Sequence, residues 1–383
     1  MSPSQTHSLR IEGWRGVNHS FALVNQHQIL HLARMPGLRL SHLDLPFAFG
    51  HWTASRNSAG FSAEDAGVIE GLPAPDDAPP DAIYRICSPY RAPADSIRTA
   101  TFMATELGLT QSNFDGPERN SYTRDGNVIA TTSHWARARI VEHGFAEAQV
   151  HVVSHGVDRA AFFPTPPDER AAGRANLGFQ EDETVFLNVG VAVWNKGIDL
   201  VLRAFAQLRR KGLRARLILK DQRDVYGIGV DAMVQSLVAS CPELADPATI
   251  AAISVIPGNL SQMQLRQLFG IADCYVSPYR AEGFNLPVLE AIACGLPVIA
   301  SSGGATDDFC NDDVAWRIET TPGTRTDPVS GETLRFVEPV FDDLVCAMTA
   351  FAKGLRPQAL GRERVLEAFT WQRAAEKVVE VLF

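Results

Sequence analysis

Two carboxylates in the second half of the chain have a spacing suited to a sugar nucleotide. Glu282 and Glu290 stand eight positions apart, across a Gly-Phe-Asn-Leu-Pro run that begins at Gly283. A carboxylate can accept two hydrogen bonds from the vicinal diol of a ribose, and a second carboxylate can meet a sugar ring. The pair therefore predicts a nucleotide-sugar site. The alternative is that both glutamates are solvated residues at the start of a helix.

A predicted strand, loop and helix position these carboxylates. Residues 274–277 form an apolar run typical of a buried strand, and Pro287 suits the first turn of a helix over residues 287–294. Such a helix directs its free N–H groups and the positive end of its dipole back at the loop.

The loop itself is expected to hold the ligand through its backbone. Gly283 would let the ligand approach the chain closely. The amides that would bind the hexose or the distal phosphate belong to Phe284, Asn285 and Leu286.

The segment from Ser277 to Ser302 resembles the donor-site motif of the family 4 glycosyltransferases, which are retaining enzymes of the two-domain GT-B fold. The resemblance extends over residues 125–383, and more loosely over residues 8–124. It implies that Glu282 lies near the donor hexose and that Glu290 binds the ribose.

A second loop of the same family pattern lies upstream. Residues 190–197 resemble the family's glycine, arginine, lysine-glycine loop, which implies that Gly190 approaches the donor and that Lys196 faces the diphosphate. The family's arginine falls at Val191 in this chain. Arg280 is a candidate to replace that phosphate contact.

The mechanism that we expect uses neither a metal nor a cofactor. The chain contains no Asp-x-Asp, the usual way of bringing a metal to a nucleotide diphosphate, so Lys196, backbone amides and helix dipoles must meet the leaving-group charge. The family resemblance implies front-face attack, in which the departing phosphate oxygen takes the acceptor proton. Glu282 is then an orienting and electrostatic group rather than a covalent nucleophile.

A loop in the first half is the counterpart of the donor loops. Residues 14–20 follow a predicted strand and precede a predicted helix, where a doubly wound fold places a ligand loop. Gly16 would approach the donor, Ser20 would cap the helix, and His19 would contact the acceptor or the donor hexose. The alternative for His19 is a loop histidine without a ligand.

Several other polar residues are weaker candidates for the functional site. His27 and His31 have the i, i+4 spacing of metal ligands but are expected to be a surface pair, because no third ligand accompanies them. Glu106 is a candidate cleft residue, and Asp307 and Asp308 are expected to cap a helix rather than line the cleft.

Composition excludes some classes of protein. A net charge of −9 argues against nucleic-acid binding and against a broad cationic surface on anionic lipid, although the cluster of cations over residues 209–216 could act locally. No run of 18 apolar residues and no signal peptide is visible. We expect a cytoplasmic protein with at most peripheral contact at the inner membrane face. The six cysteines, without C-x-x-C spacing, are expected to be reduced packing residues.

The order of elements predicts the fold class. Strand-like and helix-like runs alternate in both halves, which indicates α/β domains with parallel, doubly wound sheets. In the first half an amphipathic helix is expected over residues 21–35. In the second half strands are expected over residues 184–189, 215–219, 253–256 and 274–277, and helices over residues 198–210, 230–239 and 261–269. The GT-B resemblance implies two Rossmann-like domains that face each other across a cleft. We expect an acceptor-side domain over residues 1–165 and a donor-binding domain over residues 166–370. Residues 54–81 are expected to be a surface excursion.

The last helix has one apolar face and belongs, by the same resemblance, to the first domain. Its face includes Trp371, which is expected to pack rather than to hold a sugar. This helix, residues 371–383, would complete the first domain.

The function expected from this sequence is a hexosyltransferase. It would move a hexose from a UDP- or GDP-linked donor to a hydroxyl of a glycan, lipid-linked or small-molecule acceptor, with retention and without a metal. The alternatives are a nucleotide-sugar epimerase, a phosphorylase with Lys196 or Lys220 as its pyridoxal phosphate lysine, and a non-catalytic sugar-nucleotide binder. Base, hexose, acceptor and oligomeric state are not specified by the sequence.

Overall fold

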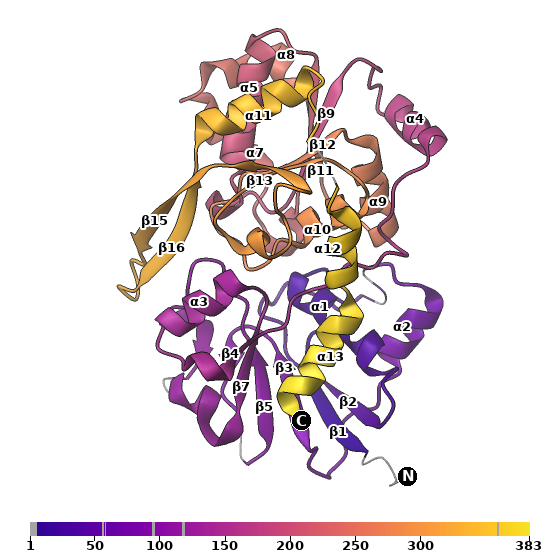
Figure 1. Cartoon of the computed structure of the whole chain (residues 1–383), viewed down its shortest axis with the longest axis vertical. Helices are drawn as coiled ribbons and strands as arrows, with labels where there is room; N and C mark the ends of the chain where they lie inside the picture. Colours follow the sequence, from indigo (N-terminus) through magenta and orange to yellow (C-terminus); the bar gives the residue numbers. More distant parts are fainter. Residues whose placement is uncertain (1–5, 56, 58, 94–95, 117–118, 358–359) are drawn as a thin grey trace. The chain divides into compact units, whose positions relative to one another are not determined.

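The computed structural model describes residues 6–55, 57, 59–93, 96–116, 119–357 and 360–383. It divides into two compact units (Figure 1). Unit 1 comprises Met1–Gly156, Thr324–Arg335 and Ala368–Phe383, and unit 2 comprises Val157–Gly323 and Phe336–Glu367. In the described part of the chain, no helix is long and apolar enough to cross a membrane.

Unit 2 is built around a six-stranded parallel sheet. Its strand order is β11-β10-β9-β12-β13-β14. The strands are β9 (Thr184–Val189), β10 (Ala215–Lys220), β11 (Ile253–Ile256), β12 (Cys274–Ser277), β13 (Val298–Ser301) and β14 (Ala315–Ile318). The predicted bounds of β9, β11 and β12 are confirmed without change, because each is a short apolar run between polar loops.

The helices of unit 2 pack against this sheet and against one another. They are α4 (Pro167–Asn176), α5 (Ile198–Arg210), α6 (Arg223–Tyr226), α7 (Val230–Val238), α8 (Pro247–Ile250), α9 (Gln262–Ile271), α10 (Leu286–Ala293), α11 (Phe341–Ala352) and α12 (Arg362–Ala368). The apolar stripe of α5 is buried with α11 in one core, and the two helices lie side by side in Figure 1.

Unit 1 has its own six-stranded parallel sheet, with the order β2-β1-β3-β5-β7-β8. These strands are β1 (His7–Gly13), β2 (Leu38–Asp44), β3 (Ala82–Ile86), β5 (Arg98–Phe102), β7 (Val128–Thr131) and β8 (Val150–Val152). A short pair, β4 (Tyr90–Arg91) and β6 (Phe114–Asp115), forms a separate sheet. The helices are α1 (Ser20–Leu32), α2 (Ala63–Glu70), α3 (His134–Glu142) and α13 (Trp371–Leu382). The α/β class with two parallel, doubly wound sheets is thus confirmed.

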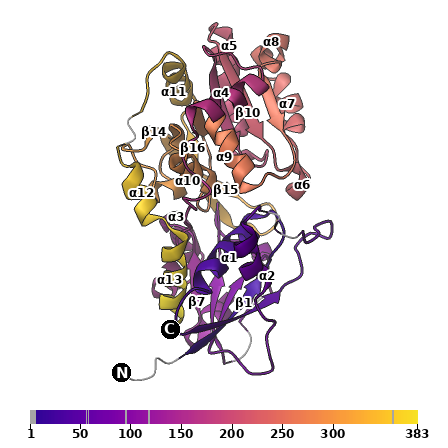
Figure 2. The same ribbon diagram turned by 90° about the vertical axis from the view of Figure 1, so that its right-hand side faces the viewer.

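The helix α13 packs on unit 1, beside α1 and against β5 and β7 (Figures 1 and 2). Trp371 is 3 % exposed and stacks on His27 of α1, with ring centroids 4.6 Å apart and planes 2° apart. The packing role predicted for Trp371 is therefore confirmed. The prediction that His27 belongs to a surface pair is wrong, because α13 covers it; burial, with smaller contributions from His31 and His155, lowers its pKa to about 3.

The helix α1 also differs from the amphipathic helix expected over residues 21–35. Its consecutive polar residues Asn25, Gln26, His27 and Gln28 are all buried, so α1 has no solvated polar stripe. Tertiary packing on both sides of α1 explains the difference, since a helix enclosed by neighbours buries every face.

A β-hairpin absent from the sequence predictions joins the two units along the chain. It consists of β15 (Thr320–Thr326) and β16 (Thr333–Pro339), and its tip, Thr324–Arg335, belongs to unit 1. There Glu332 pairs with Arg119, with 2.5 Å between Nη2 and Oε1, and accepts the Gln111 amide. The units therefore divide the chain differently from the expected ranges 1–165 and 166–370.

The cation cluster on unit 2 is largely neutralised by local carboxylates. Arg210 pairs with Glu243, Arg214 with Asp182, and Arg216 with Glu183. Surface pairs of this kind reduce the positive potential of the cluster, as expected for a solvated helix end.

Candidate functional site

The two loops singled out in the sequence meet at one edge of the unit 2 sheet. One loop follows β9 and the other follows β12, and these strands are neighbours. From β9 the chain proceeds outward through β10 and β11, then returns to the other side of β9 with β12. The loops therefore lie at the switch point of a doubly wound sheet, where open α/β sheets bind their ligands.

Hydrogen bonds join the two loops. The backbone carbonyl of Asn195 accepts hydrogen bonds from the backbone N–H groups of Arg280, at 2.7 Å, and Ala281, at 3.2 Å. The side-chain amide of Asn195 donates to the Ala281 carbonyl at 3.2 Å. Gly197 closes the first loop with φ +69°, and a Cβ there would lie 1.9 Å from the Pro278 carbonyl oxygen. Only glycine satisfies both the backbone angle and this contact.

This junction brings Lys196 and Glu282 together. The Lys196 Nζ lies 2.7 Å from Glu282 Oε2, and their side chains are 19 % and 11 % exposed. The sequence placed one residue at a diphosphate and the other at a hexose without predicting that they touch. Because both remain partly accessible, an incoming diphosphate can exchange with Glu282 for the ammonium group.

Arg280 is committed to a different set of partners. Its guanidinium donates to both oxygens of Asp199, at 2.8 and 2.9 Å, and to Glu338 at 2.8 Å. It also donates to the Trp194 carbonyl at 2.8 Å and is 5 % exposed. Burial opposes the cation, but the bonds to Asp199 and Glu338 outweigh it and raise the pKa of Arg280.

This geometry argues against Arg280 as the replacement for the family's arginine. A phosphate would have to displace Asp199 or Glu338 from a buried guanidinium that already donates to both carboxylates. Val191 itself is 6 % exposed and packs as an apolar residue. Arg280 instead fixes the Trp194 carbonyl and the start of α5, where Asp199 lies, relative to the β12 loop.

The turn into α10 is shaped by Asn285. This residue has φ +76° and its side-chain amide donates to the Ser277 hydroxyl at 3.0 Å, which ties the turn to the end of β12. Phe284 is buried against Phe309, with ring centroids 4.9 Å apart. Gly283 and Leu286 flank this turn, and Gly190 follows β9 with its amide on the Lys220 carbonyl at 3.1 Å.

Glu290 lies inside the first turns of α10 and is 7 % exposed. No hydrogen bond or ion pair reaches its carboxyl group within the part of the chain that the structure describes. Burial raises its pKa to about 8. The free protein thus holds Glu290 mostly as the neutral acid at neutral pH, and a ribose diol would supply the hydrogen bonds that stabilise its anion.

Replacing Glu290 by glutamine should remove a pH-dependent penalty on folding. The unfolded carboxyl titrates near 4.5 and the folded one near 8, so the folded state of the parent protein loses stability as pH rises between these values. We expect the variant's advantage in melting temperature to grow from pH 5 to pH 8, to a free-energy difference on the order of 4 kcal/mol.

Thermal melts at pH 5, 6, 7, 8 and 9 measure this advantage. The matched control is Glu367→Gln, which changes an exposed glutamate in α12. A gap between parent and E290Q that stays constant over this pH range would contradict the raised pKa.

The unit 1 loop after β1 differs in part from its prediction. His19, not Ser20, is the N-cap of α1, and its Nδ1 accepts the Phe21 amide at 3.1 Å. The predicted cap at Ser20 is therefore wrong; an imidazole nitrogen takes that role. Burial against Trp14 and Trp52 lowers the pKa of His19 to about 4, so the ring is neutral near pH 7. Gly16 has φ +70° in the same loop.

The remaining candidates have structural partners. The Glu106 carbonyl accepts the Trp135 indole N–H at 2.7 Å. Asp307 accepts the Gly303 amide at 2.9 Å and pairs with Arg317, so it closes the turn after β13 instead of capping a helix as predicted. Lys220 is buried, its ammonium donates to the Asp221 carbonyl, and burial lowers its pKa.

Two residues that hold the site together were not predicted. Asp199 and Glu338 anchor Arg280 from α5 and β16. Asp199 could have been noticed as an acidic residue in the first turn of a predicted helix, directly after the lysine-glycine pair. No sequence signal marks Glu338.

Comparison with known proteins identifies the unit 2 segment. Residues 169–322 match the family model of glycosyl transferases group 1. A D-inositol 3-phosphate glycosyltransferase of Mycobacterium tuberculosis is 33 % identical over 218 residues, which are 54 % of this chain and 42 % of that protein. The chain thus matches about two fifths of the length of this curated relative.

Solved structures share the fold over almost the whole chain. An Anabaena protein in complex with UDP and glucose, HepE, has a TM-score of 0.66 at 15 % identity, covering 98 % of this chain and 99 % of its own. The sucrose-phosphate synthase of Thermosynechococcus elongatus has a TM-score of 0.64 at 17 % identity, covering 98 % of both chains. At these identities the likeness establishes the GT-B fold.

Proposed function

We propose that the protein is a retaining hexosyltransferase. The premise is that residues 169–322 match the family model of glycosyl transferases group 1. Its donor is a UDP- or GDP-linked hexose, and its acceptor is a hydroxyl of a glycan, a lipid-linked sugar or a small molecule. The observation that carries this proposal is the Lys196–Glu282 pair, held at the sheet's switch point beside the start of α10.

In this proposal, different residues of unit 2 bind different parts of the donor. Lys196 binds the diphosphate and offsets the negative charge that grows on it as the sugar departs. Amides at Phe284, Asn285 and Leu286 and the dipole of α10 bind the distal phosphate or the hexose. Glu290 accepts the two ribose hydroxyls as its proton leaves. The likeness to a structure that holds UDP and glucose supports this assignment.

In the proposed reaction, the acceptor oxygen forms a bond to the anomeric carbon as the bond to the diphosphate oxygen breaks on the same face. The departing phosphate oxygen takes the acceptor proton, so the configuration is retained. Glu282 orients the hexose and stabilises its positive charge rather than forming a covalent bond. No cofactor is required, because Lys196 and the backbone meet the leaving-group charge.

Titration calorimetry with UDP, GDP and UMP, with and without EDTA, tests the donor site. We expect one nucleoside diphosphate to bind, with an affinity that EDTA leaves unchanged. Glu290→Ala should weaken this binding by about tenfold, the loss of one good bidentate contact, whereas Glu282→Ala should lower kcat more than affinity.

The outcomes separate the alternatives. Nucleotide binding without transfer or hydrolysis of any donor sugar would indicate a non-catalytic binder. If both glutamate variants lose affinity alone, the division of roles between them is wrong. Transfer that stops in EDTA would contradict the metal-free mechanism.

A further inference from the structure

A small niche in unit 1 lies on one face of the sheet, beside the first residues of β1 and β2. Its volume is about 80 Å³, room for a few water molecules or for one group of similar size. Its walls come from β1, from β2 and from residues 73–80, which lead towards β3, and all three stretches are described without a gap.

The strand register places two arginines and two serines together in this niche. In the parallel pair of β1 and β2, Ser8 lies directly opposite Arg39, and Arg10 lies directly opposite Ser41. Residues two apart on a strand point to the same face, so the four side chains share one face of the sheet. Guanidinium and hydroxyl groups both donate hydrogen bonds, and the niche is therefore rich in donors.

Hydrogen bonds hold the third wall of the niche in place. At one end of the segment 73–80, the Pro73 carbonyl accepts the His42 amide at 2.9 Å. Beyond the other end, the Asp81 carboxylate accepts the amide and the hydroxyl of Ser8, at 2.7 and 2.9 Å. The wall is thus tied to both strands, and the niche needs no ligand to form.

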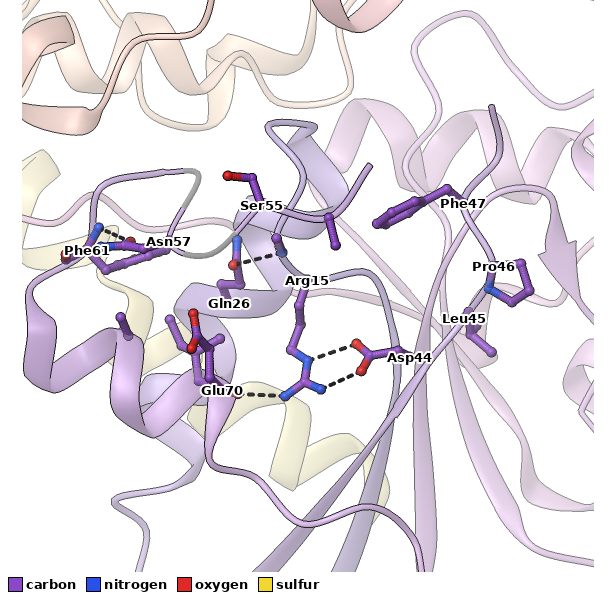
Figure 3. A pocket seen from close by; sticks show the side chains of 14 residues that line it. Arg15, Gln26, Asp44, Leu45, Pro46, Phe47, Ser55, Asn57, Phe61 and Glu70 are labelled. Carbon is purple, nitrogen blue, oxygen red and sulfur yellow. Dashed lines mark hydrogen bonds and ion pairs between the residues drawn. The ribbon is translucent and has the colours of Figure 1, made fainter. Parts of the chain in front are cut away.

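Arg10 has no acceptor within the described part of the chain. Its Nε is buried and makes no hydrogen bond there, and no ion pair reaches its guanidinium. Arg15, by contrast, donates to both oxygens of Asp44 (Figure 3). Arg85 donates to Glu12 at 2.8 Å. Because a buried charged donor without an acceptor is costly, Arg10 favours an anionic ligand.

Two carboxylates share this face or line the niche, and each has another partner. Glu12, two residues along β1 from Arg10, is paired with Arg85. Asp76 lies 3.8 Å from Arg39, and the two side chains are 66 % and 65 % exposed. Water screens so exposed a pair, so its field in the niche is weak. The charge of Arg10 therefore remains uncompensated.

We propose that this niche binds a tetrahedral oxyanion, either free phosphate or sulfate or the same group on a small ligand. Arg10 donates to two of its oxygens, in the fork geometry that suits phosphate, and the Ser41 hydroxyl donates to a third. The niche has room for the anionic group alone, so any organic part of the ligand lies outside it. The site stands whether or not the protein transfers a sugar, because its residues all belong to unit 1.

Titration calorimetry with inorganic phosphate, sulfate, glycerol 3-phosphate and acetate, at constant ionic strength, tests the niche. The full chain carries Lys196→Ala in every titration, so that the ammonium group at the donor loops adds no phosphate binding. We expect the tetrahedral anions to bind and acetate to bind at least tenfold more weakly. Adding Arg10→Gln should weaken phosphate binding at least tenfold. Arg34→Gln, which removes an exposed cation of the same unit, should leave it unchanged.

A second variant fills the niche with a built-in anion. Ser41→Asp places a carboxylate directly opposite Arg10, so it should abolish phosphate binding and melt at least as high as the parent, whereas the neutral Ser41→Asn should still bind.

The relative affinities of the probes identify the source of the anion. Glycerol 3-phosphate that binds as tightly as phosphate would assign the niche to an ester, and binding of the free ions alone would assign it to an inorganic anion. Phosphate binding that survives Arg10→Gln or Ser41→Asp, acetate that binds as tightly as phosphate, or an absence of binding by all the tetrahedral anions would overturn the proposal.

Discussion

Replacing Lys196 by alanine is expected to lower kcat for sugar transfer by 10²- to 10³-fold, the usual cost of removing one group that stabilises developing negative charge. The same change should weaken UDP binding much more than UMP binding, because in the proposed donor site the ammonium group binds the distal phosphate, which only UDP has. Initial rates and calorimetry with the two nucleotides measure both effects.

The control for this variant is Lys353→Ala, which removes an exposed lysine at the end of α11. Lys196→Arg keeps the charge and should recover part of the activity. Equal losses of UDP and UMP affinity would mean that Lys196 supports the site only through its 2.7 Å contact with Glu282.

Arg280→Ala is expected to destabilise unit 2 by about 3 kcal/mol or more, because it leaves two carboxylates without their shared cation. Asp199 and Glu338 are 21 % and 41 % exposed, so water recovers part of the loss. Arg280→Lys should recover little, since one ammonium cannot donate to Asp199 and Glu338 in the fork geometry. Urea unfolding followed by tryptophan fluorescence measures the cost.

Arg364→Ala is the matched control. Its ion pair with Asp313 is exposed on both sides, at 66 % and 53 %, and should contribute no more than about 1 kcal/mol. If the two arginine variants lose the same stability, the Arg280 cluster is an ordinary surface ion pair. Arg280 would then be available to a phosphate.

The part of the chain from residue 184 to residue 277 could be predicted closely. The helix α5 begins and ends at its predicted residues, Ile198 and Arg210, as do β9, β11 and β12 at theirs. Each is a clean apolar pattern between glycines, prolines and charged residues, and neighbours in the sequence decide such patterns.

The first half of the chain and the β15–β16 hairpin were less predictable, because these elements depend on distant partners. The strand β2 was not predicted, and neither was the β15–β16 hairpin whose tip packs on unit 1. The run Asn25–Gln28 reads as polar surface until α13, from the end of the chain, covers it. No local pattern reports a contact of that kind.

By itself, the sequence determined the order of the main elements from β9 to α10 and the residues of the two loops that follow β9 and β12, because glycines, prolines and apolar runs act through local geometry. Only the tertiary structure decided how those residues are used. It paired Lys196 with Glu282, committed Arg280 to Asp199 and Glu338, and raised the pKa of Glu290 to about 8. The strength of an ion pair depends on the distance through space between groups that are far apart in the chain. Desolvation depends on which residues bury a group. Neither the distance nor the burial can be read from the order of the residues.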